Sequence, residues 1–551
     1  MNSALGVCGQ LGRGDDGRAR AIARLLGGLP RLIDHDNGVL HGSAACQRWP
    51  DTETVAVSWS PSPMPDPVPA TTADSLAREY DAASMVLRGD GTAALVTGIS
   101  GAVPLYADLD GGAVHFASRL GALAVTRPDG RAAPDWDAWA HVIAAGGPLE
   151  GRTVFQGIRR LQPWERVTVD TAGTTRRSTP SWPWLEVDSR PDVAVGTGLD
   201  AVRDALAEAV ATQAGRGPLV SLLSGGWDSR ILAAFAANAG ADLRARTTSS
   251  DTGHVLEELV ATKVAARLGI EHAIVQGRWD EFGADLRRFA DVVDYQTSFH
   301  VWAVPLARAV TGDGETVLDG LGGGIFVGGA FPDPATAGAA VDDRFTRLTH
   351  YLDAAGDVLR PHVARQIRER TRASFRVVAE PLADHPYGAT FTAYLTRTLP
   401  GISLSPYGLF ADGGPVATPF LADRVVRAAL SIPRAHHADG RLYRPLLHAA
   451  APSLADLPTA ADLAPRHRRH LRRVSSVEAA AEVRALLTAG PVAELLAPEL
   501  ARADLDRWCT LLDRTKSQHL LRGLATLALW LDRYGERIAT SSPDVFLEPV
   551  G

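Results

Sequence analysis

The residues best suited to chemistry lie between Pro218 and Arg230, in the stretch PLVSLLSGGWDSR. Ser224 and Ser229 supply hydroxyls, and adjacent glycines let successive backbone N–H groups point into one concavity at the start of a helix, where a phosphate is the natural occupant. Asp228 would repel a bare phosphate, which implies a divalent cation between them, usually Mg²⁺. We therefore predict a site for a nucleotide polyphosphate.

The motif S-G-G-x-D-S lacks the G-K-[ST] ending of a Walker loop, in which a lysine reaches the β and γ phosphates. It resembles the loop of the PP-loop ATP pyrophosphatases, which cleave ATP between the α and β phosphates and adenylylate a substrate. The resemblance implies ATP and Mg²⁺ as cofactors. It also implies nucleotide-binding roles for Ser224, Gly225, Gly226, Asp228 and Ser229.

The strands and helices around this loop predict an α/β fold. The apolar run before Ser224 predicts a buried strand, and strands at 242–250, 271–276 and 315–320 alternate with helices at 254–269 and 285–294. Such alternation indicates a parallel sheet with helices on both faces, and ligands bind at the carboxyl ends of its strands. We expect the loop, the strand end at Thr247 and Thr248, and the stretch after Asp319 to converge, with adenine and ribose against Thr247 and Thr248.

The first 190 residues form short β-like runs and predict a β-rich layered domain. Pro104–Leu123 and Thr153–Val169 resemble segments of the N-terminal Ntn-type glutaminase domain of class B asparagine synthetases. That glutaminase uses a cysteine at position 2 whose free amine is the base. Position 2 here is Asn2, and the internal Cys8 has only an amide nitrogen. We predict a catalytically degenerate glutaminase-like domain over 1–190, joined by a linker at Thr179–Asp192 to an adenylylating domain over 191–551 with a helical C-terminal part.

A later motif of asparagine synthetases, G-x-G-x-D-E-x-x-G-G, is altered in this chain. Gly320–Gly329 reads GLGGGIFVGG, so Gly324 and Ile325 stand where the family has its acidic pair, while Gly322 and Gly323 stay beside the nucleotide. Asp319 can serve as the second metal ligand after a small backbone shift, or Asp228 can hold Mg²⁺ with phosphate and water oxygens. The third possibility is impaired catalysis.

A positive charge is also needed where pyrophosphate departs. Gly440–Pro458 resembles the family segment whose lysine contacts phosphate, and Arg444 is its nearest counterpart, with Arg441 as the alternate. The basic run Arg466–Arg473 predicts a solvated helix face, with a lid over ATP or a contact for an acidic peptide as alternatives. His300 is interpreted as structural, with an acceptor-pocket role as the alternative.

Composition excludes several classes of protein. The chain has 551 residues and a net charge of −7, which gives no global electrostatic reason to bind nucleic acid. No apolar run approaches the ~18 residues of a membrane helix, and the N-terminus lacks a signal-peptide pattern, so we expect a cytoplasmic location without a membrane partner. Cys8, Cys46 and Cys509 are too far apart in sequence to indicate a disulfide framework or a zinc site.

Within the superfamily, an N-terminal domain without the catalytic cysteine is similar to β-lactam synthetases and, above all, lasso peptide macrolactam synthetases. The resemblance implies adenylylation of an Asp or Glu side chain of a core peptide and its joining to the peptide's N-terminal amine. It further implies a leader peptidase and a leader-binding protein as partners. The alternatives are a small-molecule amide or β-lactam synthetase, an ammonia-dependent asparagine synthetase, and a non-catalytic scaffold.

Overall fold

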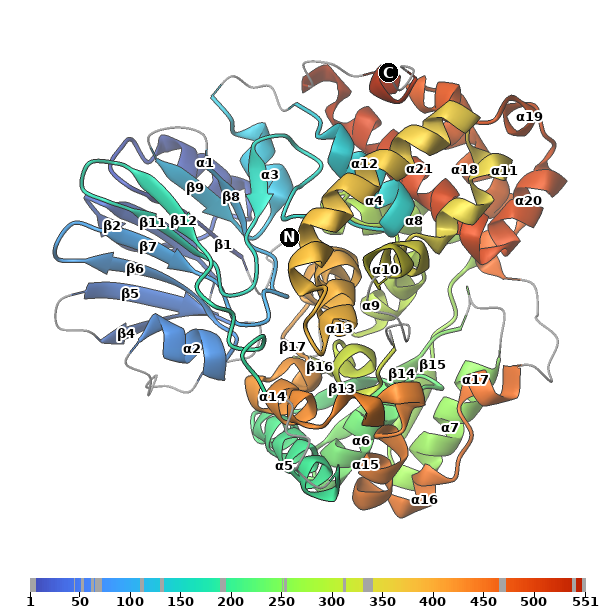
Figure 1. Ribbon diagram of the computed structural model, residues 1–551, viewed down its shortest axis with the longest axis horizontal. Coiled ribbons are helices and arrows are strands. Elements are labelled where there is room, and N and C mark those ends of the chain that lie inside the picture. Colours follow the sequence, from blue (N-terminus) through green and yellow to red (C-terminus); the bar gives the residue numbers. More distant parts are fainter. Residues whose placement is uncertain are drawn as a thin grey trace.

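Three β-sheets organise the chain in the computed structural model, which describes residues 6–43, 45–50, 54–60, 64, 72–109, 113–128, 133–188, 195–249, 251, 255–310, 314–330, 340–464, 472–537 and 542–547. Asn2, residues 189–192 of the predicted linker and residues 466–471 of the basic run lie outside these ranges. Two of the sheets come from the first third of the chain, and the third contains the predicted phosphate loop (Figure 1).

The two N-terminal sheets are antiparallel and six-stranded. The first runs in the order β10 (Ile158–Arg160), β8 (Tyr106–Asp108), β9 (Val114–Ala117), β1 (Val7–Leu11), β3 (Gly38–Gly42), β2 (Arg31–His35). The second runs β12 (Thr175–Ser178), β11 (Arg166–Val169), β7 (Ala93–Val96), β6 (Ala83–Arg88), β5 (Thr54–Trp59), β4 (Cys46–Pro50). Their facing side chains form one apolar core, in which the rings of Trp59 and Phe116 stack with centroids 6.1 Å apart. The predicted β-rich layered region is therefore confirmed.

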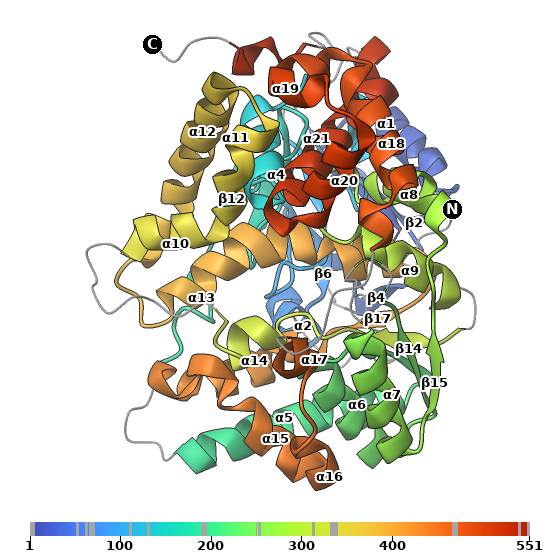
Figure 2. The ribbon, with the colours of Figure 1, turned by 90° about the vertical axis from the view of Figure 1, so that its right-hand side faces the viewer.

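The third sheet is parallel and five-stranded. Its order is β15 (Glu271–Ile274), β14 (Leu243–Thr247), β13 (Leu219–Leu222), β16 (Thr316–Leu318), β17 (Val416–Ala417). Helices pack on it, namely α5 (Val195–Ala214), α6 (Asp228–Asn238), α7 (Leu256–Leu268), α14 (Asp423–Ser431) and α15 (Tyr443–Ala450) (Figure 2). The predicted alternation of strand and helix is confirmed. It places β13 between β14 and β16, so the loops after these three strands meet at one edge.

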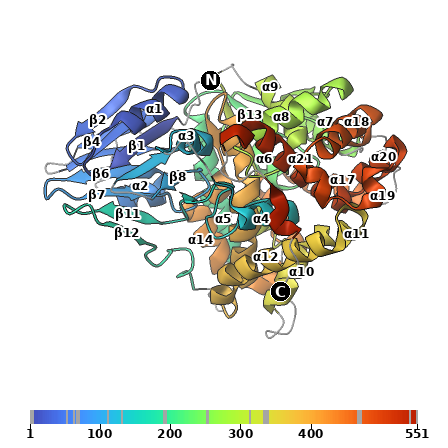
Figure 3. The ribbon, with the colours of Figure 1, turned by 90° about the horizontal axis from the view of Figure 1, so that it is seen from above.

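A helical layer links the two halves of the chain. α4 (Trp136–Ala145), from the N-terminal third, packs against α12 (Pro361–Ala379) and α21 (Thr515–Tyr534), and the rings of Trp139 and Trp530 lie 5.3 Å apart. Seen from above, the antiparallel sheets lie beside these helices (Figure 3). Further helices are α1 (Gly17–Leu25), α2 (Ala73–Glu79), α3 (Leu120–Val125), α8 (Phe282–Val292), α9 (Val304–Val310), α10 (Ala340–Leu348), α11 (Ala355–Val358), α13 (Gly388–Ala393), α16 (Pro452–Ala455), α17 (Ala460–Leu463), α18 (Val477–Thr488), α19 (Pro498–Ala501) and α20 (Leu505–Asp513).

The described part of the predicted linker is firmly packed. Trp182 and Trp184 are 5% and 0% exposed, and their rings contact Tyr394. The Trp184 indole N–H also donates to Asp423 at 2.9 Å. The segment before residue 189 therefore joins the two halves through a shared core rather than as a free tether. None of the described helices combines the length and apolar character that crossing a membrane requires.

Candidate active site

The structure forms the predicted strand, loop and helix, because β13 ends at Leu222 and α6 begins at Asp228. Hydroxyls of the loop close it: Ser229 Oγ accepts from the Ser224 N–H at 2.9 Å, and Ser224 Oγ accepts from the Gly226 N–H at 3.2 Å. The Gly225 N–H donates to the Glu257 carboxylate at 2.5 Å. These N–H groups, expected to face a phosphate, thus donate to protein oxygens, and an incoming anion has to compete with Glu257.

A buried arginine fixes the loop to a distant part of the chain. Arg230 is 0% exposed, and its guanidinium donates to the carbonyl oxygens of Leu457 at 2.7 Å and Pro458 at 3.1 Å. It also lies 5.1 Å from the centroid of the Trp227 ring, and burial lowers its pKa to about 10. Sequence reasoning did not single out Arg230. The one signal in the sequence that could have identified Arg230 was its position, a charged residue in the first turn of a largely buried helix.

Asp228 is held with one carboxylate oxygen left without a partner. The Tyr443 hydroxyl and the Gly324 N–H act on its carboxyl and lower the pKa of that group, against the larger effect of burial, whereas Oδ1 is buried and accepts no hydrogen bond from the described residues. A Cβ on Gly323 would lie 2.3 Å from Asp228 Oδ1, so only glycine fits there. A Cβ on Gly324 would lie 3.8 Å from Asp228 Oδ2, which is an ordinary contact. The position of the family's acidic residue is thus open to a larger side chain.

Asp319 follows β16 directly, and its Oδ1 accepts the Leu321 N–H at 2.8 Å. Burial raises the pKa of Asp319 to about 6. Burial first, and then the negative charge of Asp319, raise the pKa of Asp228 to about 6. Two carboxyl groups that repel each other in a partly dry site keep their protons to a higher pH than usual, and a positive charge between them would favour the ionised forms.

This pair fits a magnesium ion. Asp228 Oδ1 is a buried oxygen without a partner, and carboxylates are the protein ligands that Mg²⁺ prefers. The described residues contain no cluster of three or more His, Cys, Asp or Glu side chains able to hold a metal. Two carboxylates with phosphate and water oxygens are nevertheless a normal set for Mg²⁺, which keeps several waters. Asp228 and Asp319 are the residues that would hold the ion.

The two carboxyl groups face an open cavity of ≈ 360 Å³. Of the residues singled out from the sequence, it is lined by Ser224, Asp228, Ser229, Asp319, Gly322, Gly324, Ile325 and His300. Three π-helical segments, Gly323–Val327, Tyr394–Ile402 and Ser405–Phe410, supply much of the remaining wall. π-Helical turns are rare and often mark functional sites. Nothing in the sequence pattern signalled them.

The other candidates lie beside the cavity or away from it. Thr247 is buried at the end of β14, where its hydroxyl donates to the Leu223 carbonyl at 2.6 Å and so braces the loop; Thr248 follows it. Neither they nor Gly225, Gly226 and Gly323 line the cavity itself. Arg441 and Arg444 are exposed and do not line it, and Asp462 is a charged neighbour of Arg444. From that segment it is Tyr443 that contacts the site.

The cavity wall also contains His300, Trp302, Arg397 and Ser405. His300 Nδ1 and Ser405 Oγ are 2.6 Å apart, and burial, followed by the charges of Arg522 and Arg397, lowers the pKa of His300 to about 3. The imidazole is therefore neutral at physiological pH. His300 lines the cavity, and its acceptor-pocket role stays a prediction, whereas sequence reasoning missed Arg397 and had no signal for it.

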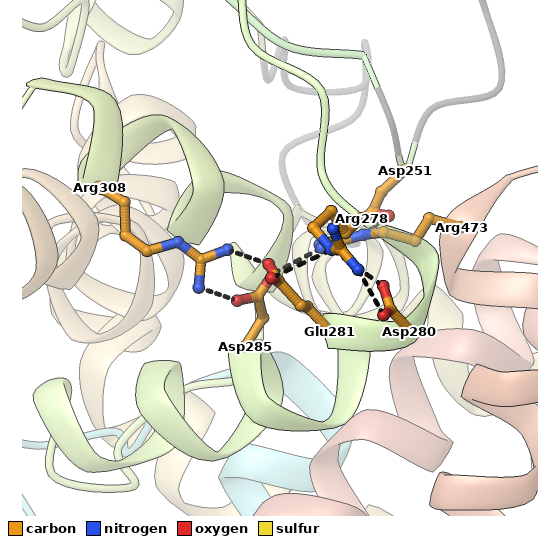
Figure 4. Close-up of polar contacts among 7 residues, drawn as sticks. All are labelled: Asp251, Arg278, Asp280, Glu281, Asp285, Arg308 and Arg473. Atoms are coloured by element: carbon orange, nitrogen blue, oxygen red, sulfur yellow. Dashed lines mark hydrogen bonds and ion pairs between the residues drawn. The ribbon is translucent and has the colours of Figure 1, made fainter.

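The end of the basic run is buried, which corrects the prediction of a solvated helix face for Arg472 and Arg473. They are 4% and 0% exposed. Arg473 pairs with Asp251 at 3.0 Å and also with Asp285, which in turn pairs with Arg308 at 2.7 Å (Figure 4). The network fixes the chain after β14 against α8. Desolvation without partners would be costly, so these ion pairs explain how Arg473 stays buried, and Arg472 pairs with Asp513 at 2.9 Å.

Cys8 lies in the middle of β1 and pairs across the sheet with His41 and Ala117. Its side chain is 0% exposed, and burial, followed by the nearby Cys46, raises the pKa of the Cys8 thiol to about 12. The thiolate, which is the nucleophilic form, is therefore negligible at neutral pH.

Comparison with known proteins places the chain in a family. A comparison with curated proteins found no match. The model of the asparagine synthase family, in contrast, matches residues 201–532, a region that contains the phosphate loop, the parallel sheet and most of the C-terminal helices. Because this region is more than half of the 551 residues, the chain belongs to the asparagine synthase family.

Proposed function

We propose that the chain is an ATP-dependent macrolactam synthetase of the lasso peptide type. Membership in the asparagine synthase family supports ATP-dependent amide-bond formation in general. The narrower proposal is that the carboxylate comes from an Asp or Glu side chain of a core peptide and the amine from the N-terminus of the same peptide. Both groups then enter the cavity between the phosphate loop and His300.

The observation that carries the enzymatic proposal is the carboxyl pair at the edge of the parallel sheet. Asp228 has a buried oxygen without a partner, and Asp319 supplies a second negative charge beside it. Two acids with raised pKa values that line one open cavity are typical of a functional site. Magnesium bound there would neutralise the phosphate charge that develops as pyrophosphate leaves.

The reaction then runs in two steps. The side-chain carboxylate attacks the α-phosphorus of ATP, the bond to the β-phosphate breaks, and pyrophosphate departs. The N-terminal amine attacks the activated carbonyl, AMP leaves with one carboxylate oxygen, and the amine releases a proton, so the peptide loses one water. Ser224 and Ser229 offer hydroxyls to the phosphates, and the enclosing wall holds amine and acyl group together, which removes much of the entropic barrier.

Cys8 favours a peptide amine over ammonia as the nucleophile. A buried thiol with a pKa of about 12 and an amide nitrogen within a strand cannot release ammonia from glutamine by the Ntn mechanism. A substrate that carries its own amine needs no such release. The two N-terminal sheets would then act as a scaffold.

The test supplies the chain with ATP, Mg²⁺ and leader-free peptides that carry an acidic side chain several residues from a free N-terminus. The companion peptidase and leader-binding protein encoded with the precursor are included. Mass spectrometry should show loss of one water. The loss should disappear when the acid is changed to its amide and when the N-terminus is acetylated. AMP formation driven by a free amino acid or β-amino acid, without any dehydrated peptide, would favour the small-molecule synthetase, and no turnover at all would favour a scaffold.

A further inference from the structure

The phosphate loop is bound in the structure by an anion that belongs to the chain itself. The Gly225 N–H donates to Oε2 of Glu257 at 2.5 Å, and the Gly225 carbonyl oxygen accepts the N–H of Ala460 at 3.0 Å. Glu257 stands in the first turn of α7, and Ala460 begins α17, a helix that lies beside α7 (Figure 1). Both backbone groups of Gly225 are therefore engaged by other parts of the chain.

These contacts explain which parts of the loop face the cavity. A Cβ on Gly225 would lie 2.5 Å from Ala460 Cβ and 2.9 Å from Glu257 Oε2, so Gly225 is enclosed from two sides. Accordingly, Ser224 and Ser229 line the cavity, whereas Gly225 does not. A phosphate can therefore reach the Gly225 N–H only if the Glu257 side chain moves away.

Glu257 brings a negative charge that none of the described side chains neutralises. It forms no ion pair with a described Lys, Arg or His, and its contact with the loop is made through a backbone N–H. Glu257 is half-buried, so solvent and salt screen its charge only in part. The surroundings of the phosphate loop thus contain three carboxyl groups, those of Asp228, Asp319 and Glu257.

We infer that Glu257 determines which ionic form of a polyphosphate the loop accepts, because it discriminates against the bare anion and in favour of the complex with a divalent cation. The inference deepens the proposed function and rests on its nucleotide half, since it concerns the ATP that adenylylates the carboxylate. It assigns a role to a residue that sequence reasoning did not single out.

The discrimination follows from charge. A bare pyrophosphate that binds the loop takes the Gly225 N–H from Glu257 and then lies near the displaced carboxylate, and like charges in a partly desolvated site repel strongly. The magnesium complex of the same anion carries less negative charge, and its cation can be held by Asp228 and Asp319. The repulsion from Glu257 is therefore smaller for the complex than for the bare anion.

The experiment measures binding without turnover. The full chain is titrated by calorimetry with pyrophosphate in EDTA, and with pyrophosphate and α,β-methylene-ATP, which cannot release pyrophosphate, in excess Mg²⁺. Glu257→Gln keeps an acceptor for the Gly225 N–H but removes the charge, so bare pyrophosphate should bind about tenfold more tightly than to the wild type. The affinity for the two magnesium complexes should rise by about threefold or less, so the preference for the complex should narrow.

Glu258→Gln is the matched control. Glu258 is the next residue of the same helical turn and carries the same charge, but it bonds to Ser249 and, at 2.9 Å, to Gln276 rather than to the loop. Its variant should therefore retain the wild-type preference for the magnesium complex. Glu257→Ala removes the acceptor as well as the charge, and its affinity for bare pyrophosphate should rise at least as much as that of Glu257→Gln.

Unchanged affinity for bare pyrophosphate in both Glu257 variants would overturn the inference, because the contact with Gly225 would then be structural. Weaker binding of the magnesium complexes would overturn it as well, since Glu257 would then hold the cation. Equal gains for both ionic forms would show competition without selection. A chain that has the expected selectivity but dehydrates no peptide would keep the inference and lose the proposed function, and peptide dehydration with unchanged affinities would do the reverse.

Discussion

The N-terminal sandwich and the parallel-sheet half each contain a buried side chain of a reactive type, with opposite consequences. Cys8 lies in the middle of β1, and burial raises the pKa of its thiol to about 12. Asp228 starts α6, and burial raises the pKa of its carboxyl to about 6. Desolvation acts on both groups, but it makes the thiol inert and leaves the carboxyl within reach of ionisation.

The difference lies in what surrounds the two groups. Cys8 faces an apolar core that includes Ile22 and Leu123, and its side chain is 0% exposed. Asp228 faces an open cavity with a second acid, Asp319, and has an oxygen without a hydrogen bond. We therefore expect a buried ionisable group to be functional here only where the fold also leaves room for a counter-charge.

Removing Asp228 should have the largest effect. Asp228→Ala should lower turnover at least ~10²-fold, because it removes a metal-side charge from a site that works by electrostatic stabilisation. AMP release under saturating ATP and Mg²⁺ measures it. Tyr443→Phe, which keeps the ring and removes a hydroxyl that acts on the pKa of Asp228, serves as the milder comparison. If Asp228→Ala kept an activity within about twofold of wild type, the buried carboxyl would matter no more for turnover than the buried Cys8 thiol, and the contrast between the two halves would be wrong.

Replacing the second acid sharpens the comparison. Asp319→Asn should raise the Mg²⁺ concentration for half-maximal activity by about tenfold, since one of two carboxylates is lost. Gly324→Asp in that background should restore part of the activity, because a Cβ there makes only an ordinary contact with Asp228 Oδ2 at 3.8 Å. Gly323→Asp is the matched negative control, since its Cβ would lie 2.3 Å from Asp228 Oδ1. Unchanged Mg²⁺ dependence in Asp319→Asn would exclude Asp319 as a ligand.

The raised pKa values of Asp228 and Asp319 predict a pH dependence of intermediate size. Between about pH 4 and 6, both carboxyl groups bind more protons in the folded chain than in the unfolded chain. The free energy of unfolding of the ligand-free protein should therefore fall as the pH rises from about 4 to 6. Each carboxyl group contributes on the order of 1–3 kcal/mol to this change. Asp228→Asn should make the free energy of unfolding, measured in urea titrations, depend less steeply on pH. Mg²⁺ affinity should change in the opposite sense and rise several-fold from pH 5.5 to 7.5. An affinity that is flat over this range would contradict a shared carboxylate site.

The smallest effect should come from Cys8. Cys8→Ser should leave AMP release unchanged, and the folded wild type should release no glutamate from L-glutamine, because the thiol is 0% exposed and its pKa is raised to about 12. Iodoacetamide should label Cys8 only after denaturation. Glutamate release that is lost in Cys8→Ser would show that the sandwich is itself a catalytic domain.

The sequence predicted the frame of the site because local patterns carry it. The apolar run before Ser224 and the helix after Trp227 specify the loop, and alternation of strand and helix specifies the parallel sheet that places Asp319 near Asp228. The buried residues of α5 follow the same helical period, since Val202, Leu206 and Val210 are all 0% exposed. Period and spacing are local properties of the chain.

Other parts of the site depend on contacts between residues distant in sequence. Arg230 is held by the carbonyl groups of Leu457 and Pro458, which are far from it in sequence. Arg397 lines the cavity from a π-helical segment, which hydrophobic periodicity does not predict. The burial of Arg473 depends on Asp251 and Asp285. A charged residue reads as exposed in a sequence until the fold supplies its partners. Arg444 is a related case: its place in a sequence segment predicted a role in the site, but the fold leaves its side chain outside the cavity wall.

The most direct test of the account follows oxygen from the substrate to the nucleotide. A peptide that is dehydrated by the chain is prepared with ¹⁸O in its acidic side chain and turned over with ATP and Mg²⁺, and the products are analysed by ³¹P NMR and mass spectrometry. Adenylylation at the Ser224–Asp228–Asp319 site predicts AMP that carries one ¹⁸O together with unlabelled pyrophosphate. ADP with ¹⁸O in inorganic phosphate, or AMP without label, would contradict it.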